Sequence, residues 1–236
     1  MRTLILIFLL LPLGLRAQED EYRMEIGGAL GTDFYLGDVN STPFRKPGVM
    51  AGFLLRRNFN PRMGVKANLA FGTLRGDSGA RFLPSDAATP GAQGGLPASV
   101  SFKRSVLDMG AQFELNLLGY GLGHEYQGVK RWSPYLTMGL GLTLAMGGNS
   151  KAAAGLNVPL GMGVKYKWKP RVNVGAEWTF RFTTTDALDV MGGQPTLSHP
   201  FGIQSSGFKN KDAYSFLMFF LTYDISPKCK ECHNNK

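Results

Sequence analysis

Two consecutive segments of the chain alternate between large apolar residues and small or polar ones. The first segment places its large apolar residues on one face, namely Val158, Leu160, Met162, Val164, Tyr166 and Trp168. Its other face holds Asn157, Gly161, Gly163, Lys165 and Lys167. After Pro170 and Arg171 the same alternation resumes over residues 172–182. A two-residue period is typical of β-strands with one apolar face, so the pair is predicted to be a hairpin with a very short turn.

The position of the bulky residues leaves two alternatives for the fold. A soluble sandwich fills its interior with the bulky face of each strand. A small membrane barrel turns that face toward lipid and keeps glycines and charges in a narrow lumen.

The amino terminus favours the membrane alternative. Residues 1–17 read as a secretory signal peptide, with Arg2 as a basic start, an apolar run over residues 4–11 and cleavage near Ala17 or Gln18. An uncleaved membrane helix is disfavoured, because the run is shorter than the roughly 20 residues that cross a bilayer. No lipobox cysteine precedes the mature start, so no lipid anchor is expected. The mature chain then divides into a barrel over residues 18–226 and a tail over residues 227–236.

Six further alternating segments complete the predicted sheet. They cover residues 24–36, 48–59, 65–72, 106–117, 135–144 and 212–225, and the second has no clear polar face. Short turns alternate with longer loops, as in outer-membrane barrels with periplasmic turns and external loops. The sequence therefore predicts an all-β fold, an eight-stranded antiparallel transmembrane β-barrel of the Gram-negative outer membrane, with both termini periplasmic.

Aromatic residues near the predicted strand ends agree with a membrane location. Trp132, Tyr166, Trp168 and Tyr223 would lie toward the periplasmic ends, and Tyr35, Phe182 and Tyr214 toward the outer ends. Such rings favour the membrane interface, where an apolar body and a polar tip are both satisfied.

The inward faces of the predicted strands carry charges of both signs. The expected lumen charge network consists of Lys66, Asp108, Glu114, Lys165, Glu177 and Arg181. Opposite charges in a confined space pair, because an unpaired buried charge is costly. A plugged, salt-bridged interior is therefore expected, with a proton or ion path as the alternative.

Several motifs resemble those of the PorG-like outer-membrane β-barrel family, which is associated with type IX secretion. They are residues 35–40 (YLGDVN), 134–135 (PY), 159–166 (PLGMGVKY), 177–181 (EWTFR) and 185–190 (TDALDV). The resemblance covers essentially the mature chain, although the tail after Ile225 has no counterpart. The family-motif positions that it marks are Tyr35, Gly37, Asp38, Pro159, Gly161, Glu177, Arg181, Asp186 and Asp189.

The resemblance implies a non-enzymatic structural component of the type IX protein secretion machinery. Members are similar to small barrels that hold a periplasmic ring-forming lipoprotein and its partner subunit against the outer membrane. Docking is expected at the connection over residues 119–132, with Lys130 and Arg131. The alternative is a surface-facing small barrel that serves ligand binding, adhesion or envelope stability through loops 75–99 and 183–211. Outer-membrane lipids and lipopolysaccharide are expected partners, and no nucleic-acid motif is present.

Motifs for cofactors, adhesion and catalysis are weak. Cys229, Cys232 and His233 fit the CxxCH haem-attachment pattern but lie near the chain end, so a local disulfide or dithiol is preferred and no cofactor is expected. Residues 75–77 (RGD) resemble an integrin-binding tripeptide, which arises often by chance. Asp38, Asp186 and Asp189 are read as loop-capping carboxylates, and no metal site is expected. None of the three histidines lies on a predicted strand beside a nucleophile, so no enzyme activity is expected.

Overall fold

Eight long strands form the body of the protein. The computed structural model describes residues 24–36, 43–77, 101–121, 129–147, 152–185, 188 and 212–225. The long strands are β1 (Met24–Leu36), β2 (Gly48–Asn60), β3 (Met63–Asp77), β4 (Ser101–Asn116), β7 (Trp132–Met146), β8 (Ala153–Lys169), β9 (Val172–Thr183) and β10 (Ala213–Asp224).

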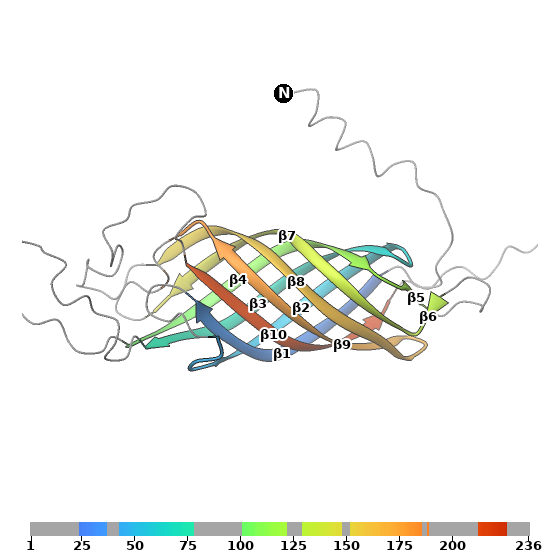
Figure 1. Ribbon diagram of the computed structural model, residues 1–236, viewed down its shortest axis with the longest axis horizontal. Coiled ribbons are helices and arrows are strands. Elements are labelled where there is room, and N and C mark those ends of the chain that lie inside the picture. The colour runs from blue at the N-terminus through green and yellow to red at the C-terminus, as the bar shows by residue number, and fades with distance from the viewer. Residues whose placement is uncertain are drawn as a thin grey trace, which may run out of the picture.

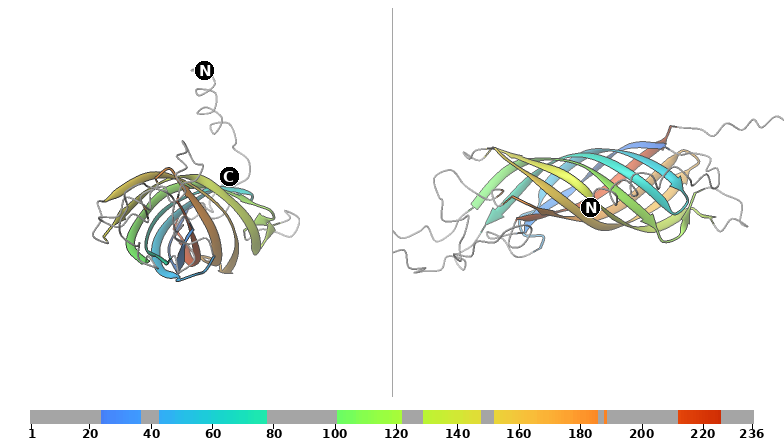
Figure 2. Two further views of the ribbon diagram at one scale, coloured as in Figure 1. Left: turned by 60° about the vertical axis from the view of Figure 1, so that its left-hand side comes forward. Right: turned by 90° about the horizontal axis from the view of Figure 1, so that it is seen from above.

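The eight strands close into one barrel in the order β1-β10-β9-β8-β7-β4-β3-β2 (Figure 1). Every neighbouring pair in this ring is antiparallel. The first and last strands complete the ring, with Glu25 opposite Asp224 and Leu36 opposite Ala213. The closed barrel has no unpaired strand edge. A β-sheet in the hydrocarbon core of a membrane requires this, because unpaired backbone groups find no water there. Figure 2 shows the strands curving around a closed interior. The predicted eight-stranded antiparallel barrel is confirmed.

The two ends of the barrel differ in their connections. Pro61 and Arg62 join β2 to β3, and Pro170 and Arg171 join β8 to β9, both at the right-hand end of Figure 1. The chain enters and leaves the barrel at this same end, where the Ile225 N–H donates to the Met24 carbonyl at 2.9 Å. We name this the turn end and the opposite one the loop end.

One connection at the turn end has a structure that the sequence did not predict. Between β4 and β7, β5 (Gly119–Tyr120) and β6 (Val129–Lys130) form a two-residue parallel pair. The Tyr120 N–H donates to the Pro61 carbonyl at 2.9 Å, and the Gly121 N–H donates to the Lys130 carbonyl at 3.2 Å. These bonds hold the connection against the turn end of the barrel.

The strand alternation places large apolar side chains on the outer wall. Leu30, Phe53, Leu140 and Phe219 are each exposed by 66% or more. A contiguous apolar surface of this kind is rare on a soluble monomer, but it is the normal outer face of a membrane barrel. Within the described part of the chain, no helix has the length and apolar character to cross a membrane. The predicted signal peptide and tail lie outside the described residues.

The strands extend further than predicted at the loop end. β3 runs to Asp77 and β4 begins at Ser101, and residues 73–77 pair with residues 101–105. The predicted loop start at Arg75 was therefore wrong by a few residues. The low apolar content of this segment gave no reason to expect a strand there. The strand forms nonetheless, because pairing with its neighbour satisfies the hydrogen bonds of its backbone groups.

The aromatic prediction holds at the turn end and fails in part at the loop end. Trp168 and Tyr223 are 57% and 43% exposed on the outer wall, and Trp132 and Tyr166 are exposed likewise. Tyr35 and Tyr214, in contrast, are fully buried inside the barrel. Their hydroxyl groups bond to buried carboxylates, so the polar tip is satisfied in the lumen instead of at the membrane interface.

Candidate functional site

The centre of the lumen is built around Glu114 of β4. Its carboxylate lies 2.8 Å from Arg56 Nε, 3.2 Å from Lys165 Nζ and 3.6 Å from Lys66 Nζ. These cations come from β2, β8 and β3, so the contacts join strands across the interior. All four side chains are buried. One carboxylate therefore serves as the common anion of three cations.

The network continues from this centre toward β1 and β9. Arg56 Nη1 donates to Glu25 at 2.6 Å, and Lys66 pairs with Glu177. The Tyr135 hydroxyl also donates to Glu177, at 2.6 Å. Arg56, Lys66 and Lys165 thus each have a carboxylate partner, which offsets the cost of removing them from water.

A second cluster lies nearer the loop end, around Asp108. Its carboxylate is 3.1 Å from Arg181 Nε and accepts from Asn157 Nδ2 at 2.9 Å and from the Tyr214 hydroxyl at 2.7 Å. Asn68 Nδ2 donates to the other carboxylate oxygen at 2.8 Å. The structure therefore brings all six residues of the predicted lumen network into ion pairs, in two clusters.

The sequence reasoning missed Arg56, Glu25, Lys167 and Asp224. Arg56 lies on β2, which has no clear polar face. The sequence therefore did not indicate whether its side chain points inward or outward. Lys167 lies on the polar face of its strand in the sequence, which does not show its partner. That partner is Asp224, 2.7 Å away at the end of β10. Only the register between distant strands could have shown these pairs.

Apolar side chains also occupy the lumen, which the sequence did not predict. Phe216, Met218 and Phe220 of β10 point inward and are buried, together with Met50 and Leu54 of β2. The expectation that bulky residues all face outward is therefore wrong for these two strands.

Two of the buried rings also contact cations. The Arg181 guanidinium lies 4.1 Å from the centre of the Phe216 ring, and that of Arg56 lies 5.0 Å from the centre of the Phe220 ring. The rings pack against the cations and take up space that water would otherwise fill.

The connection between β4 and β7 covers the lumen at the turn end. Tyr120 is buried, its hydroxyl donates to Asn173 Oδ1 at 2.7 Å, and its ring centre lies 4.9 Å from Lys165 Nζ. Burial raises the pKa of Tyr120 above the ordinary tyrosine value, so the phenol stays neutral. Tyr120 therefore closes this mouth with a neutral ring beside two lysines, since Lys167 Nζ also lies 5.7 Å away.

The lumen is also covered at the loop end. The Tyr35 hydroxyl donates to the Asp212 carboxylate, which also accepts the Leu188 N–H at 2.9 Å. Leu188 is fully buried, although the chain on either side of it lies outside the described residues. Phe102 packs edge-on against the Tyr35 ring at 5.0 Å. These side chains fill the mouth above the Asp108 cluster.

The charges are segregated between the interior and the surface. Every acidic side chain whose burial the structure describes is buried, namely Glu25, Asp33, Asp108, Glu114, Glu177, Asp212 and Asp224. The exposed charged side chains in the same part of the chain are all basic, namely Arg45, Lys46, Arg57, Arg62, Arg75, Lys103, Lys130, Arg131, Lys169 and Arg171. The predicted docking pair, Lys130 and Arg131, thus lies exposed at the turn end.

The motif positions marked by the family resemblance divide between the lumen and undescribed segments. Tyr35, Pro159, Glu177 and Arg181 are buried, and Gly161 faces inward, where an added Cβ would lie 2.4 Å from the Trp178 carbonyl oxygen. Gly37, Asp38, Asp186 and Asp189 lie outside the described residues, as do Cys229, Cys232 and His233. The RGD aspartate, Asp77, ends β3, and its side chain is also outside the description.

Comparison with known families identifies the chain at the level of sequence. The model of a domain of unknown function, DUF6089, matches residues 1–234. The chain belongs to the DUF6089 family. No curated protein matches the sequence of this DUF6089 member.

Solved structures share the fold of the DUF6089 barrel. Neisserial surface protein A is 12% identical with a TM-score of 0.50, and the match covers 86% of this chain and 97% of that one. Ail of Yersinia pestis, in complex with the heparin analogue sucrose octasulfate, is 13% identical with a TM-score of 0.43, covering 87% and 99%. The N-terminal β-barrel domain of Pseudomonas aeruginosa OprF is 13% identical with a TM-score of 0.41, covering 87% and 100%. The first of these matches, with its TM-score of 0.50, shows that the DUF6089 barrel shares the fold of Neisserial surface protein A.

The chemistry available inside the DUF6089 barrel is that of charge pairing. Among the described residues, no group of three or more His, Cys, Asp or Glu side chains could hold a metal ion. All three histidines and both cysteines lie outside the described residues. What the described lumen does provide is a set of fixed ion pairs that tie β1, β2, β3, β4, β8, β9 and β10 together.

Proposed function

We propose that this DUF6089 member is a sealed, non-enzymatic barrel of the Gram-negative outer membrane that anchors a periplasmic assembly. The observation that carries the proposal is the inverted distribution of side chains. The outer wall is apolar, while the acidic side chains are buried with cations in the lumen. Such a body is stable in hydrocarbon and offers no aqueous path. The function of the barrel is then to hold the attached assembly at a fixed position in the membrane.

The two ends of the barrel support a proposed orientation in the membrane. Outer-membrane barrels keep short turns and both termini in the periplasm and longer loops outside. In this orientation the turn end, with Lys130 and Arg131 exposed, faces the periplasm. The signal peptide predicted from residues 1–17 supports export to this compartment.

The assembly that the barrel would anchor is proposed from the motif resemblance to PorG-like proteins. The partners are then the periplasmic ring-forming lipoprotein and its partner subunit of the type IX secretion machinery. Exposed basic residues at the turn end suit a partner with an acidic face. Lipopolysaccharide and outer-membrane lipids are the expected surroundings of the wall and the loop end.

Deletion of the gene tests this role. Loss of type IX cargo from the medium, with recovery of ring subunits on affinity purification of the crosslinked barrel, is the expected result. The K130E/R131E variant should lose the ring subunits while the barrel remains folded. The matched control is R75E/K103E, which reverses two charges at the loop end. Normal cargo secretion in the deletion strain would contradict the proposal.

A second candidate is a surface-facing barrel without a secretion role, which serves ligand binding, adhesion or envelope stability. It is favoured by four exposed basic residues toward the loop end, namely Arg45, Lys46, Arg75 and Lys103. In that case R75E/K103E, and shortening of loops 75–99 and 183–211, would impair function, while K130E/R131E would not. The two candidates therefore predict opposite results from the same pair of variants.

A further inference from the structure

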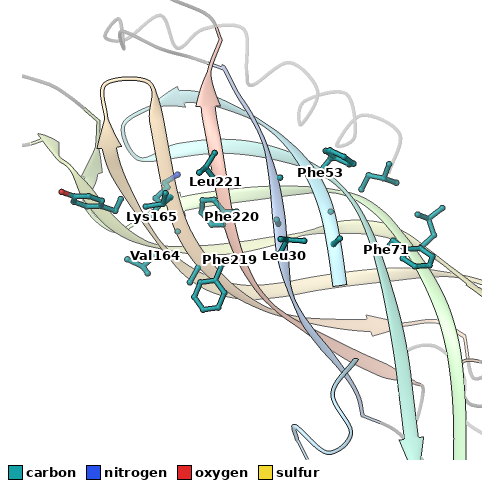
Figure 3. Close-up of a pocket in the computed structure, with 18 residues that line it drawn as sticks. Leu30, Phe53, Phe71, Val164, Lys165, Phe219, Phe220 and Leu221 are labelled. Atoms are coloured by element: carbon teal, nitrogen blue, oxygen red, sulfur yellow. The ribbon is translucent and has the colours of Figure 1, made fainter. Parts of the chain in front are cut away.

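The outer wall of the barrel carries an apolar groove of about 960 Å³. Gly28 of β1 is among the residues that line it. Leu30, Phe53, Phe219 and Leu221 contribute side chains to it (Figure 3). Gly28 has no side chain on the outward face, which leaves its part of the groove open. A Cβ added there would meet only the Gly52 carbonyl oxygen, at 3.7 Å. Its volume is near the upper end of the range for small-molecule sites, about 300–1,000 Å³.

Three basic residues lie at the turn end of the strands that form this groove. The Arg57 guanidinium is 5.8 Å from the centre of the Phe59 ring, and Lys169 Nζ is 5.5 Å from that of the Trp168 ring. Arg171 Nη1 donates to the Tyr223 hydroxyl at 3.3 Å. The three rings are exposed on the outer wall, so each cation stands at the rim of the apolar surface.

Strand register puts Lys169 and Arg171 directly beyond the groove, whereas Arg57 is the second outward-facing residue after Phe53 on β2. Gly28 is opposite Leu221, and Ile26 is opposite Tyr223, so Tyr223 is the next outward-facing residue of β10 after the groove. On β8, Tyr166 lines the groove and Trp168 is the next outward-facing residue. One such step is about 7 Å along a strand. The apolar groove, which extends from β8 through β9, β10, β1, β2 and β3 to β4, thus borders a cationic rim on this arc of the outer wall.

We propose that this arc binds an anionic phospholipid of the leaflet at the turn end. Its acyl chains lie in the groove over Gly28, and its phosphate accepts hydrogen bonds from Lys169 and Arg171 at the turn between β8 and β9. Arg57, farther along the rim on β2, adds its positive charge. Phosphate oxygens are the preferred acceptors of guanidinium and ammonium groups, and aromatic rings lie at headgroup level in membranes. No acidic side chain among those described is exposed to repel an anion.

The position of the cations favours a lipid over an acidic protein. They stand beside rings on the lipid-facing wall, whereas Lys130 and Arg131 belong to the connection between β4 and β7. The inference rests on the proposed membrane location, but it does not depend on the secretion role. Secretion could therefore fail in a deletion strain or remain normal without bearing on lipid binding.

The test is native mass spectrometry of the folded full-length mature protein. The barrel is released from nanodiscs that contain phosphatidylcholine with or without phosphatidylglycerol as the anionic probe. The wild type is expected to retain phosphatidylglycerol in preference to phosphatidylcholine, and added salt should weaken this preference. The R57Q/K169Q/R171Q variant should lose about tenfold or more of the preference, because the rim loses three positive charges.

Two matched pairs of variants separate the site from general effects. R62Q/K130Q/R131Q removes the same charge from the same end without touching an outward-facing ring contact, and it should keep the preference. Ala51→Phe fills the groove and should reduce retention of both lipids several-fold. Ala111→Phe adds the same ring to the wall at an exposed position outside the groove and should not.

Circular dichroism of each variant establishes that the barrel is folded. Equal loss of preference in the two triple-glutamine variants would show a general charge effect and overturn the proposed site. Equal retention by the wild type and R57Q/K169Q/R171Q would overturn it as well. So would loss of an acidic protein partner from R57Q/K169Q/R171Q with lipid retention unchanged.

Discussion

Arg56 reaches across β3 to Glu114, with 2.8 Å between Arg56 Nε and the carboxylate, and both side chains are completely buried. The contact is an ion pair without hydrogen-bond geometry, while Arg56 Nη1 donates to Glu25 at 2.6 Å. One guanidinium therefore connects carboxylates of β1 and β4, two strands that do not pair with each other. The lumen network thus braces the barrel across its interior as well as filling it.

Replacement of Glu114 by glutamine is expected to lower the free energy of unfolding by about 3–5 kcal/mol, because Arg56, Lys66 and Lys165 lose their common anion in a buried site. Urea unfolding in phospholipid vesicles measures this change. Lys103→Gln removes one exposed charge and should change stability by less than about 0.5 kcal/mol. Equal stability of Glu114→Gln and the wild type would show that the network adds nothing to the fold.

A glycine that lies under an aromatic ring gives the second prediction. A Cβ on Gly175 would lie 2.4 Å from Phe220 Cζ inside the lumen and 2.4 Å from the Val164 carbonyl oxygen. Gly175→Ala should therefore destabilise the barrel by about 1–3 kcal/mol through overpacking. Gly28→Ala is the matched control, because its Cβ would meet only the Gly52 carbonyl oxygen, at an ordinary contact distance of 3.7 Å. If both variants unfold at the same urea concentration, the ring does not pack on Gly175 as described.

The lumen charges were accessible from sequence because the alternation in β8 and β9 is strict. Lys165, Glu177 and Arg181 each lie between two apolar residues that face outward. The two-residue period was therefore enough to assign these three side chains to the inward face. Pairing then followed from the cost of burying a single charge. Which carboxylate meets which cation depends on register around the whole ring, and periodicity contains no information on register.

The apolar part of the lumen had no comparable signal. In β10, Phe216, Met218 and Phe220 point inward, while Leu217 and Phe219 point outward, so both faces are apolar. The side that faces lipid is set by pairing with β1 and β9, which places Tyr223 and Asp224 in fixed positions. The Tyr120 cap was missed for another reason, since it lies in a connection where no strand pattern applies.

An aromatic cluster on the outer wall gives the third prediction. Phe34 is fully buried despite its outward position, because Phe44 from the β1–β2 connection packs on it at 4.5 Å between ring centres. Phe44 also lies 6.0 Å from Trp178, whose indole N–H donates to Ser215 Oγ at 2.8 Å. Phe44 and Lys46 have positive φ angles of 60° and 49°, so tertiary packing must hold this connection in place.

Phe44→Ala is therefore expected to expose Trp178 and to destabilise the barrel by about 1 kcal/mol. Collisional quenching of fluorescence measures the exposure, in a W132F/W168F background where Trp178 is the remaining tryptophan. Phe182→Ala is the control, because Phe182 is a half-exposed ring of the outer wall. Unchanged quenching in the Phe44→Ala variant would show that the connection does not cover this wall.

Closure of the lumen gives the last prediction. The path from one mouth to the other passes Tyr120, then the Glu114 ion pairs with Phe220 beside them, then the Asp108 cluster, and finally the contact between Tyr35 and Asp212. An ion entering at either mouth would have to separate buried charge pairs, which is costly. Planar bilayers that contain the wild type should therefore show no steady conductance. Tyr120→Ala should open the turn-end mouth but also remain silent, because the Glu114 and Asp108 clusters still block the interior. Steady conductance in the Tyr120→Ala variant alone would place the barrier at Tyr120 instead of at the ion pairs, and conductance in the wild type would contradict a sealed barrel altogether.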